Sequence, residues 1–217
     1  PYLKAASDSS VQADGSVLVD DLVSAGADFE SYLKDGVYEV GEYSYGSGKD
    51  FDIHTETIDV TGFATVEDRN FFDKLAEIGS DYDFKETPIA GEIYCPKDKT
   101  DCPALIIVHG AHDAADPSYL GYEYLGRYLA SNGYVVVSVD ENIINDLSTT
   151  NDIRAIVLLE NIKAVLKENV NSESPLYGII DDSKLAIAGH SRGGEMVATA
   201  YLFNDLEAYP EDGNIKF

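Results

Sequence analysis

The feature that most constrains the fold is an apolar run that ends in a serine flanked by glycines. Residues 185–194 read LAIAGHSRGG, in which Gly189, Ser191 and Gly193 form the pattern G-x-S-x-G. A serine that projects from a tight strand-to-helix turn has a strained backbone and crowded neighbours, and glycine tolerates both. The residues before the turn predict a buried strand, and residues 195–202 predict a helix. The pattern therefore favours a catalytic nucleophile at Ser191 over a glycine corner without chemistry.

Two further apolar runs extend this organisation. Residues 104–110 read ALIIVHG and residues 134–139 read YVVVSV, and such continuous runs are typical of strands buried on both faces of a parallel sheet. Residues 118–131 and 151–169 carry apolar side chains at helical spacing. This alternation predicts an α/β protein with a mostly parallel sheet, flanking helices and right-handed crossovers.

The N-terminal part of the chain gives a weaker signal. Residues 37–45 alternate well enough to predict a strand, whereas residues 1–35 show no clear period. A chain of 217 residues with 44% hydrophobic content is long enough for one sizeable core. We therefore expect an N-terminal extension over residues 1–35 and one domain over residues 36–217.

From about Gly36 onward the chain resembles the α/β-hydrolase superfamily. The matching residues are His-Gly at 109–110, Asp-Ile-Arg-Ala at 152–155 and GHSRGG at 189–194. Within that superfamily it is most similar to secreted bacterial serine hydrolases related to cutinases, chlorophyllases and plasma-type platelet-activating-factor acetylhydrolases. The resemblance implies hydrolysis of a carboxylic ester, on a small molecule or a polymer, without a cofactor. It also implies that residues 37–45 form the first strand, antiparallel to the rest of the sheet.

A serine nucleophile needs donors for the oxyanion that forms on attack. One expected donor is the N–H of Arg192, because it follows the nucleophile at a helix start, where the helix dipole also favours negative charge. The resemblance places the second donor at the N–H of Ala111, directly after His109 and Gly110. We expect the ring of His109 to brace this loop rather than to accept protons.

The general base and its orienting acid are not placed by the sequence. In α/β-hydrolases the histidine follows the nucleophile, whereas all four histidines of this chain precede Ser191. His190 adjoins the serine, but its side chain is expected to point away from the hydroxyl. His112 either lines the acyl pocket or braces its loop.

Three explanations for the missing base stay open. The resemblance places the opening of the sixth strand at residues 214–217, so the expected α/β-hydrolase fold is incomplete after that strand begins. The sequence could be a piece of a longer protein, a second polypeptide could supply the missing strands, or the chain could be a pseudoenzyme. A parallel sheet that ended there would expose an unpaired strand edge, which favours the first two explanations.

Charge and composition narrow the range of partners. Forty acidic and fifteen basic residues give a formal net charge of −25, which repels nucleic acid and anionic membrane surfaces. No apolar stretch approaches the roughly twenty residues that span a bilayer. We therefore expect neither nucleic acid nor a membrane span.

The two cysteines bear on the cellular compartment. Cys95 and Cys102 flank a short polar connection between two apolar segments. If those segments are neighbouring strands, the two thiols come within disulfide range. We expect a disulfide and an extracellular location, with two free thiols as the alternative. A metal site is not expected, because no histidine pair lies at ligand spacing with the cysteines.

Together these patterns predict a secreted serine esterase. Two alternatives stay open. A serine peptidase on the same fold would use the same residues, and substrate profiling would separate it from an esterase. A non-catalytic binding module derived from a hydrolase would not react with a serine-directed phosphonate.

Overall fold

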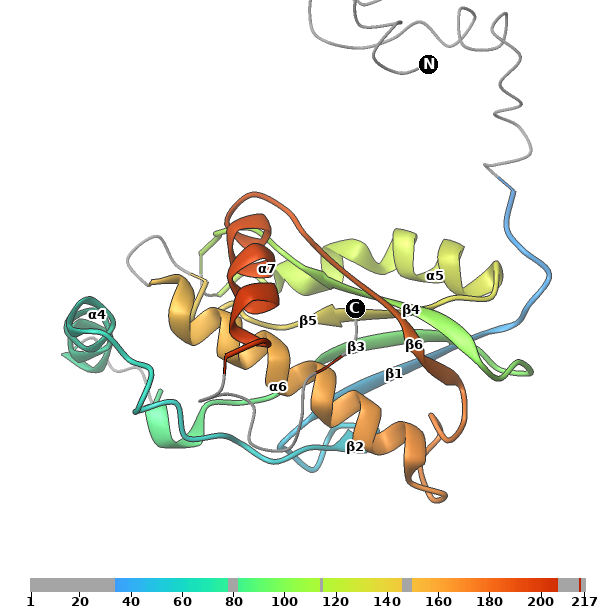
Figure 1. Ribbon diagram of the computed structural model, residues 1–217, viewed down its shortest axis with the longest axis horizontal. Coiled ribbons are helices and arrows are strands. Elements are labelled where there is room, and N and C mark those ends of the chain that lie inside the picture. The colour runs from blue at the N-terminus through green and yellow to red at the C-terminus, as the bar shows by residue number, and fades with distance from the viewer. Residues whose placement is uncertain (1–33, 78–81, 114, 146–149, 207–214, 216–217) are drawn as a thin grey trace, which may run out of the picture. The chain divides into compact units, whose positions relative to one another are not determined.

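The computed structural model describes residues 34–77, 82–113, 115–145, 150–206 and 215. From Gly36 onward these residues form a six-stranded sheet with the strand order β2-β1-β3-β5-β4-β6 (Figure 1). The strands are β1 (Val40–Gly46), β2 (Ile53–His54), β3 (Gly91–Pro96), β4 (Cys102–Val108), β5 (Val135–Val139) and β6 (Ile180–Gly189). The α-helices are α4 (Val66–Glu77), α5 (Glu123–Ser131), α6 (Asn151–Val170) and α7 (Arg192–Phe203), with short 3-10 turns at Phe84–Glu86 and Ser118–Tyr122.

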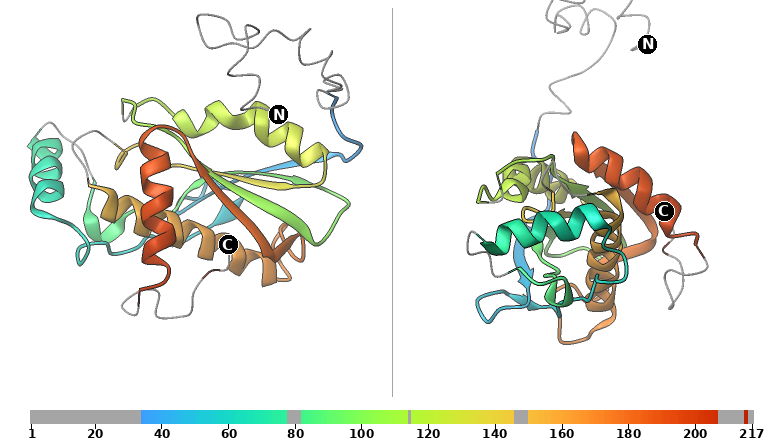
Figure 2. Two further views of the ribbon diagram at one scale, coloured as in Figure 1. Left: turned by 45° about the horizontal axis from the view of Figure 1, so that its top comes forward. Right: turned by 90° about the vertical axis from the view of Figure 1, so that its left-hand side faces the viewer.

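The sheet separates two layers of helices, with α5 on one face and α6 and α7 on the other (Figure 2). Successive side chains of a strand point to opposite faces. In β4, Ile106 packs into the core under α6, whereas Ile107 packs with the residues of α5. In β5, Val137 packs into the core under α6 and Val136 packs with the residues of α5. The continuous apolar runs therefore mark strands covered on both faces, and the predicted α/β architecture is confirmed.

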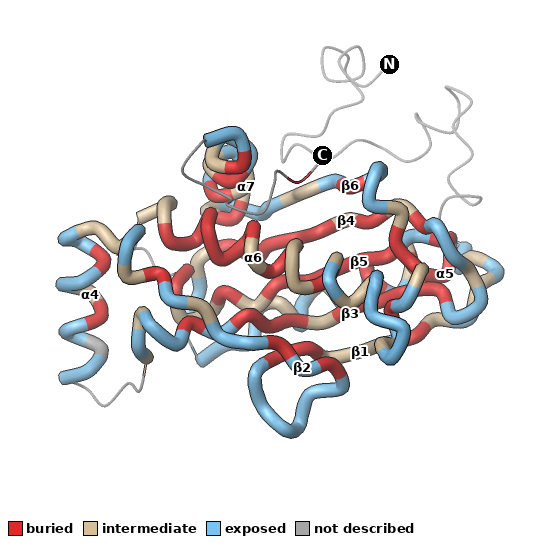
Figure 3. Tube along the Cα trace, turned by 60° about the horizontal axis from the view of Figure 1, so that its bottom comes forward, coloured by how far each residue is buried: buried red, intermediate tan, exposed pale blue. Residues whose placement is uncertain are grey.

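The parallel part of the sheet positions the serine turn. Strand β5 is fully buried in the centre, and β4 pairs in parallel with both β5 and β6. Burial falls off along β6 at the edge of the sheet, where exposed and buried residues mix (Figure 3). Because β4 and β6 are parallel, their carboxyl ends, at Val108 and Gly189, lie side by side.

The direction of the first strand differs from the expectation. Strand β3 is antiparallel to both of its neighbours, β1 and β5. Strand β1 therefore runs in the same direction as β5, and β3 is the reversed strand. The resemblance implied that residues 37–45 form the antiparallel strand, and this expectation is wrong because the reversed strand is β3, which lies between β1 and β5.

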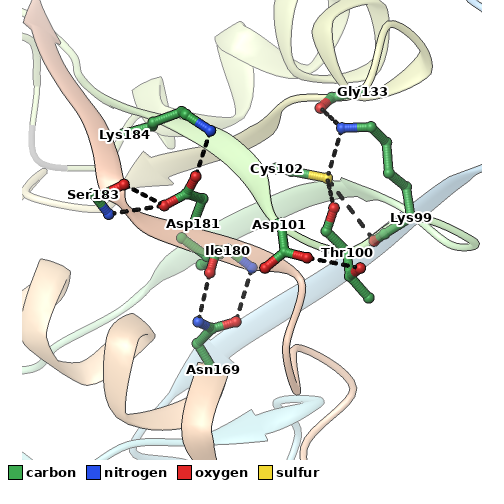
Figure 4. Close-up of polar contacts among 10 residues, drawn as sticks. All are labelled: Lys99, Thr100, Asp101, Cys102, Gly133, Asn169, Ile180, Asp181, Ser183 and Lys184. Atoms are coloured by element: carbon green, nitrogen blue, oxygen red, sulfur yellow. Dashed lines mark hydrogen bonds and ion pairs between the residues drawn. The ribbon is translucent and has the colours of Figure 1, made fainter.

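The expected disulfide is also wrong, because Cys95 and Cys102 are both buried free thiols. Their strands are not neighbours: β5 lies between β3 and β4. Two strand spacings separate the backbones by about 10 Å, beyond the reach of a disulfide. Instead, the Cys102 thiol lies near Lys99 Nζ, at 3.5 Å, and the Thr100 carbonyl, at 3.7 Å (Figure 4).

The other end of β6 is fastened to α6. The side-chain amide of Asn169 accepts from the Ile180 N–H and donates to the Ile180 carbonyl, both at 2.8 Å (Figure 4). The expected N-terminal extension lies outside the described residues except for its last two. The expected sixth strand also lies outside them except for Ile215, whose backbone forms two hydrogen bonds with Asn204.

Candidate active site

Ser191 lies on the turn that joins β6 to α7. It has φ 54° and ψ −121°, a region that non-glycine residues adopt rarely and at a cost in energy. The His190 N–H donates to the Val108 carbonyl at 3.0 Å, which ties this turn to the end of β4. The predicted strand, tight turn and helix are therefore all present.

The glycines of the motif are required by contacts between backbones. A Cβ at Gly189 would lie 2.2 Å from the Gly193 carbonyl group. A Cβ at Gly193 would lie 2.6 Å from the carbonyl oxygens of Val108 and His109. Both positions exclude a side chain because the first turn of α7 packs against the ends of two strands.

The serine side chain is exposed and faces the loop that follows β4. No hydrogen bond joins the Ser191 hydroxyl to a described residue, and the hydroxyl does not cap α7. A Cβ at Gly110 would lie 3.0 Å from the Ser191 Cβ and 3.0 Å from His190 Nδ1. This loop therefore touches the turn, and the hydroxyl is available to an incoming molecule.

The first expected oxyanion donor belongs to a peptide whose carbonyl is fixed. The Ser191 carbonyl accepts from the Gly194 N–H at 2.9 Å. In a trans peptide the carbonyl and the next residue's N–H point in opposite directions. The Arg192 N–H is therefore directed away from the helix, at its amino-terminal end, where the helix dipole favours negative charge.

The second expected donor is oriented in the same way. His109 Nε2 accepts from the Glu141 N–H at 3.2 Å, so in the neutral ring Nδ1 carries the proton and donates to the Gly110 carbonyl at 2.7 Å. Burial lowers the pKa of His109, which favours this neutral form. Because the Gly110 carbonyl is held, the Ala111 N–H points in the opposite direction.

The described part of the chain joins no histidine to Ser191 by a hydrogen bond. His54 lies on β2, at the opposite edge of the sheet from β6. Both ring nitrogens of His109 contact backbone groups, whereas His112 and His190 are exposed. His112 belongs to the same loop as His109, and the centroids of the two rings are 6.5 Å apart.

Three buried residues beside this loop matter for the site. The sequence gives no signal for Asn145 or Glu141, because neither belongs to a motif. Both carboxylate oxygens of Glu141 are buried and have no hydrogen-bond partner among the described residues, and burial raises the pKa of Glu141 well above the ordinary value. Arg154 is fully buried on α6, and its guanidinium reaches Asn145.

Two further properties of the described residues concern ligands and membranes. They contain no group of three or more His, Cys, Asp or Glu side chains placed to hold a metal ion. None of their helices is long and apolar enough to cross a membrane.

Comparison with known proteins supports the interpretation of this region. A family model described as PET hydrolase-like matches residues 86–208. Cutinase 1 from Thermobifida cellulosilytica is 34% identical over 109 residues, which cover 48% of this chain and 36% of that protein. A cutinase from Thermobifida fusca (strain YX) is 34% identical over 109 residues, 48% of this chain and 31% of that protein. The chain thus matches about a third of the length of these relatives.

Proposed function

The chain belongs to the PET hydrolase-like family, and from this membership we propose that it is a serine hydrolase that cleaves carboxylic esters through an acyl-enzyme on Ser191. Its mixed sheet with helices on both faces is the α/β-hydrolase fold of that family. One observation supports the proposal most directly: Ser191 is exposed on a strained turn between a strand and a helix.

The proposed reaction has two stages. The Ser191 oxygen attacks the ester carbonyl carbon while a base removes the hydroxyl proton, and the carbonyl oxygen becomes an oxyanion that accepts hydrogen bonds from the Ala111 and Arg192 amides. Collapse of this intermediate breaks the bond to the alcohol, which leaves with a proton from the base. Water then attacks the acyl-enzyme by the same steps and releases the carboxylic acid.

We propose that the base and its acid come from residues beyond position 217 or from another chain. The four histidines of this chain all precede Ser191, and none of them bonds the serine hydroxyl among the described residues. His109 is unsuited to the role, because its ring holds the Gly110 carbonyl and the Glu141 N–H.

The relatives guide the choice of substrate class. Because the similar Thermobifida proteins are cutinases by name, we propose an ester that is small or borne on a polymer, and an extracellular site of action. A high negative charge suits a neutral or cationic substrate surface better than an anionic one.

A comparison of two serine variants tests this function. In the full-length protein, we expect Ser191→Ala to lower the turnover of short-chain p-nitrophenyl esters by at least about a thousandfold, because the nucleophile is lost. The control is Ser183→Ala, which removes an exposed hydroxyl from the same strand and should leave turnover unchanged. Equal activity of Ser191→Ala and wild type would overturn the proposal, and preferred cleavage of peptide bonds would redirect it to a peptidase.

A further inference from the structure

We propose that Arg154, Asn145 and His109 form a positioning network that holds both oxyanion amides in place. The inference rests on the proposed function of Ser191 and adds residues that contact neither the substrate nor the serine. It follows from a continuous set of buried and part-buried hydrogen bonds that runs from α6 to the Gly110 carbonyl on one side and to the Arg192 carbonyl on the other.

The network begins at the fully buried side chain of Arg154. Its guanidinium donates to Asn145 Oδ1 at 2.8 Å, to the Thr150 carbonyl at 3.0 Å and to the Arg192 carbonyl at 3.4 Å, and it also contacts Asn151 Oδ1. All of these acceptors are neutral.

Within the described residues, no carboxylate forms an ion pair with this guanidinium, and a buried charge without such a partner is costly for stability. Burial and the nearby charge of Arg192 together lower the pKa of Arg154 to about 10, although the carboxylates of Glu141, Glu195 and Asp68 act in the opposite direction. The group is therefore poorly explained as a stabilising ion pair. Its five donors, in a fixed planar arrangement, are suited to holding several acceptors at defined positions.

Asn145 connects Arg154 to the loop after β4 by hydrogen bonds. It is fully buried, and its Nδ2 donates to the His109 carbonyl at 2.7 Å. The ring of His109 in turn holds the Gly110 carbonyl, which fixes the plane of the peptide that contains the Ala111 N–H. One end of the network thus sets the direction of one proposed donor.

The other end of the network reaches the turn that carries the serine. Arg154 binds the carbonyl of Arg192, the residue whose N–H is the other proposed donor. Since one donor lies in the loop after β4 and the other at the start of α7, a common buried group is one way to keep their relative positions constant. Errors of about 1 Å at such sites cost up to about a hundredfold in rate.

Asn145 and Asn161 offer a matched pair of variants. Asn161 is also fully buried; it accepts from the Tyr45 hydroxyl and donates to the Val157 carbonyl, both at 2.8 Å, far along α6 from the serine turn. Replacing either asparagine by alanine removes one accepted and one donated hydrogen bond, so the two alanine variants should lose comparable stability, whereas aspartate removes only the donated bond. We expect only the Asn145 variants to lose turnover, by about 10- to 100-fold, with KM unchanged.

Kinetics are measured on the full-length protein below the unfolding transition of every variant, with Ser191→Ala alongside. A fall in kcat at constant KM for Asn145→Ala, but not for Asn161→Ala, supports the network. Equal kcat values in the matched pair, or a loss that appears only in KM, would overturn it. If Ser191→Ala retains activity, the proposed function itself is wrong. The failure of the proposed function is therefore distinguishable from the failure of the network, which the Asn145 and Asn161 variants test.

Arg154 provides an independent variant. Arg154→Lys keeps the positive charge but loses the planar donors, and Arg154→Met keeps neither. We expect kcat to fall in the order wild type, Lys variant, Met variant, again with KM unchanged. Wild-type kcat in a folded Arg154→Met protein would contradict the inference.

Discussion

Glu141 lies in an environment that disfavours the charged form of its side chain. It is 2% exposed, and neither of its carboxylate oxygens bonds to any residue that the structure describes. Burial raises its pKa well above the ordinary 4.5, and the charge of Asp140 adds to this, whereas Arg154 opposes it. Its backbone N–H is nevertheless needed, because it fixes the tautomer of His109.

This raised pKa predicts a pH-dependent gain in stability for Glu141→Gln. The folded protein retains the proton in a pH range where the unfolded chain releases it, so wild-type stability falls as pH rises above 4.5 toward the folded pKa. Glutamine does not titrate, so the stability of the variant relative to wild type should increase over that range, by about 1.4 kcal/mol per unit of pKa shift. Urea unfolding between pH 4 and pH 8 measures the difference.

The control for this experiment is Glu56→Gln, which neutralises an exposed carboxylate. Its stability relative to wild type should change little with pH. A Glu141→Gln protein that is no more stable at pH 8 than at pH 4, relative to wild type, would contradict the environment described for Glu141.

At the residue scale, the sequence predicts some site residues and not others for a physical reason. Gly189 and Gly193 were predictable because a backbone contact excludes every side chain at those positions. Asn145 was not, because its role depends on neighbours 9 and 36 residues away in the chain. Nothing near Asn145 in the sequence distinguishes an asparagine that joins two buried groups by hydrogen bonds from an ordinary asparagine in a turn.

At the scale of elements, the site depends on close packing of the first turn of α7 against the ends of β4 and β6. Gly193 lies at this contact, whereas a Cβ at the adjacent Gly194 would meet its nearest atom, the Gly189 carbonyl oxygen, at 3.3 Å. The two glycines share a helical turn but differ in the space around them.

We therefore expect Gly193→Ala to be costly and Gly194→Ala to be tolerated. The first places a methyl group 2.6 Å from two carbonyl oxygens, which should destabilise the protein by about 1–3 kcal/mol and displace the serine turn. The second should change stability by no more than about 1 kcal/mol, because alanine is the better helix former. Thermal unfolding and ester turnover report the two effects, and identical behaviour of the two variants would contradict the packing described.

Element identities were predictable from the sequence, but strand neighbours were not. The apolar runs at residues 104–110 and 134–139 correspond to β4 and β5, and residues 151–169 correspond to α6. Periodicity reports which faces of an element are buried. It does not report that β5 inserts between β3 and β4, and this insertion keeps Cys95 and Cys102 apart.

At the scale of the whole molecule, the site lies at one side of the sheet. Among the described residues β6 pairs only with β4, so the flank of Ser191 away from β4 is open to residues from elsewhere. The proposed base would approach from that flank. The net charge of −25 creates a field that disfavours anionic partners, and the proposed uncharged ester carries no such penalty.

The proposed function requires that Ser191 forms a covalent intermediate whose oxyanion is held by two backbone amides. A crystal structure of the full-length protein after reaction with a serine-directed phosphonate tests it most directly. We expect phosphorus bonded to Ser191 Oγ, with one phosphonyl oxygen about 3 Å from both the Ala111 and Arg192 nitrogens. An unmodified Ser191, or an adduct oxygen that contacts neither amide, would contradict it.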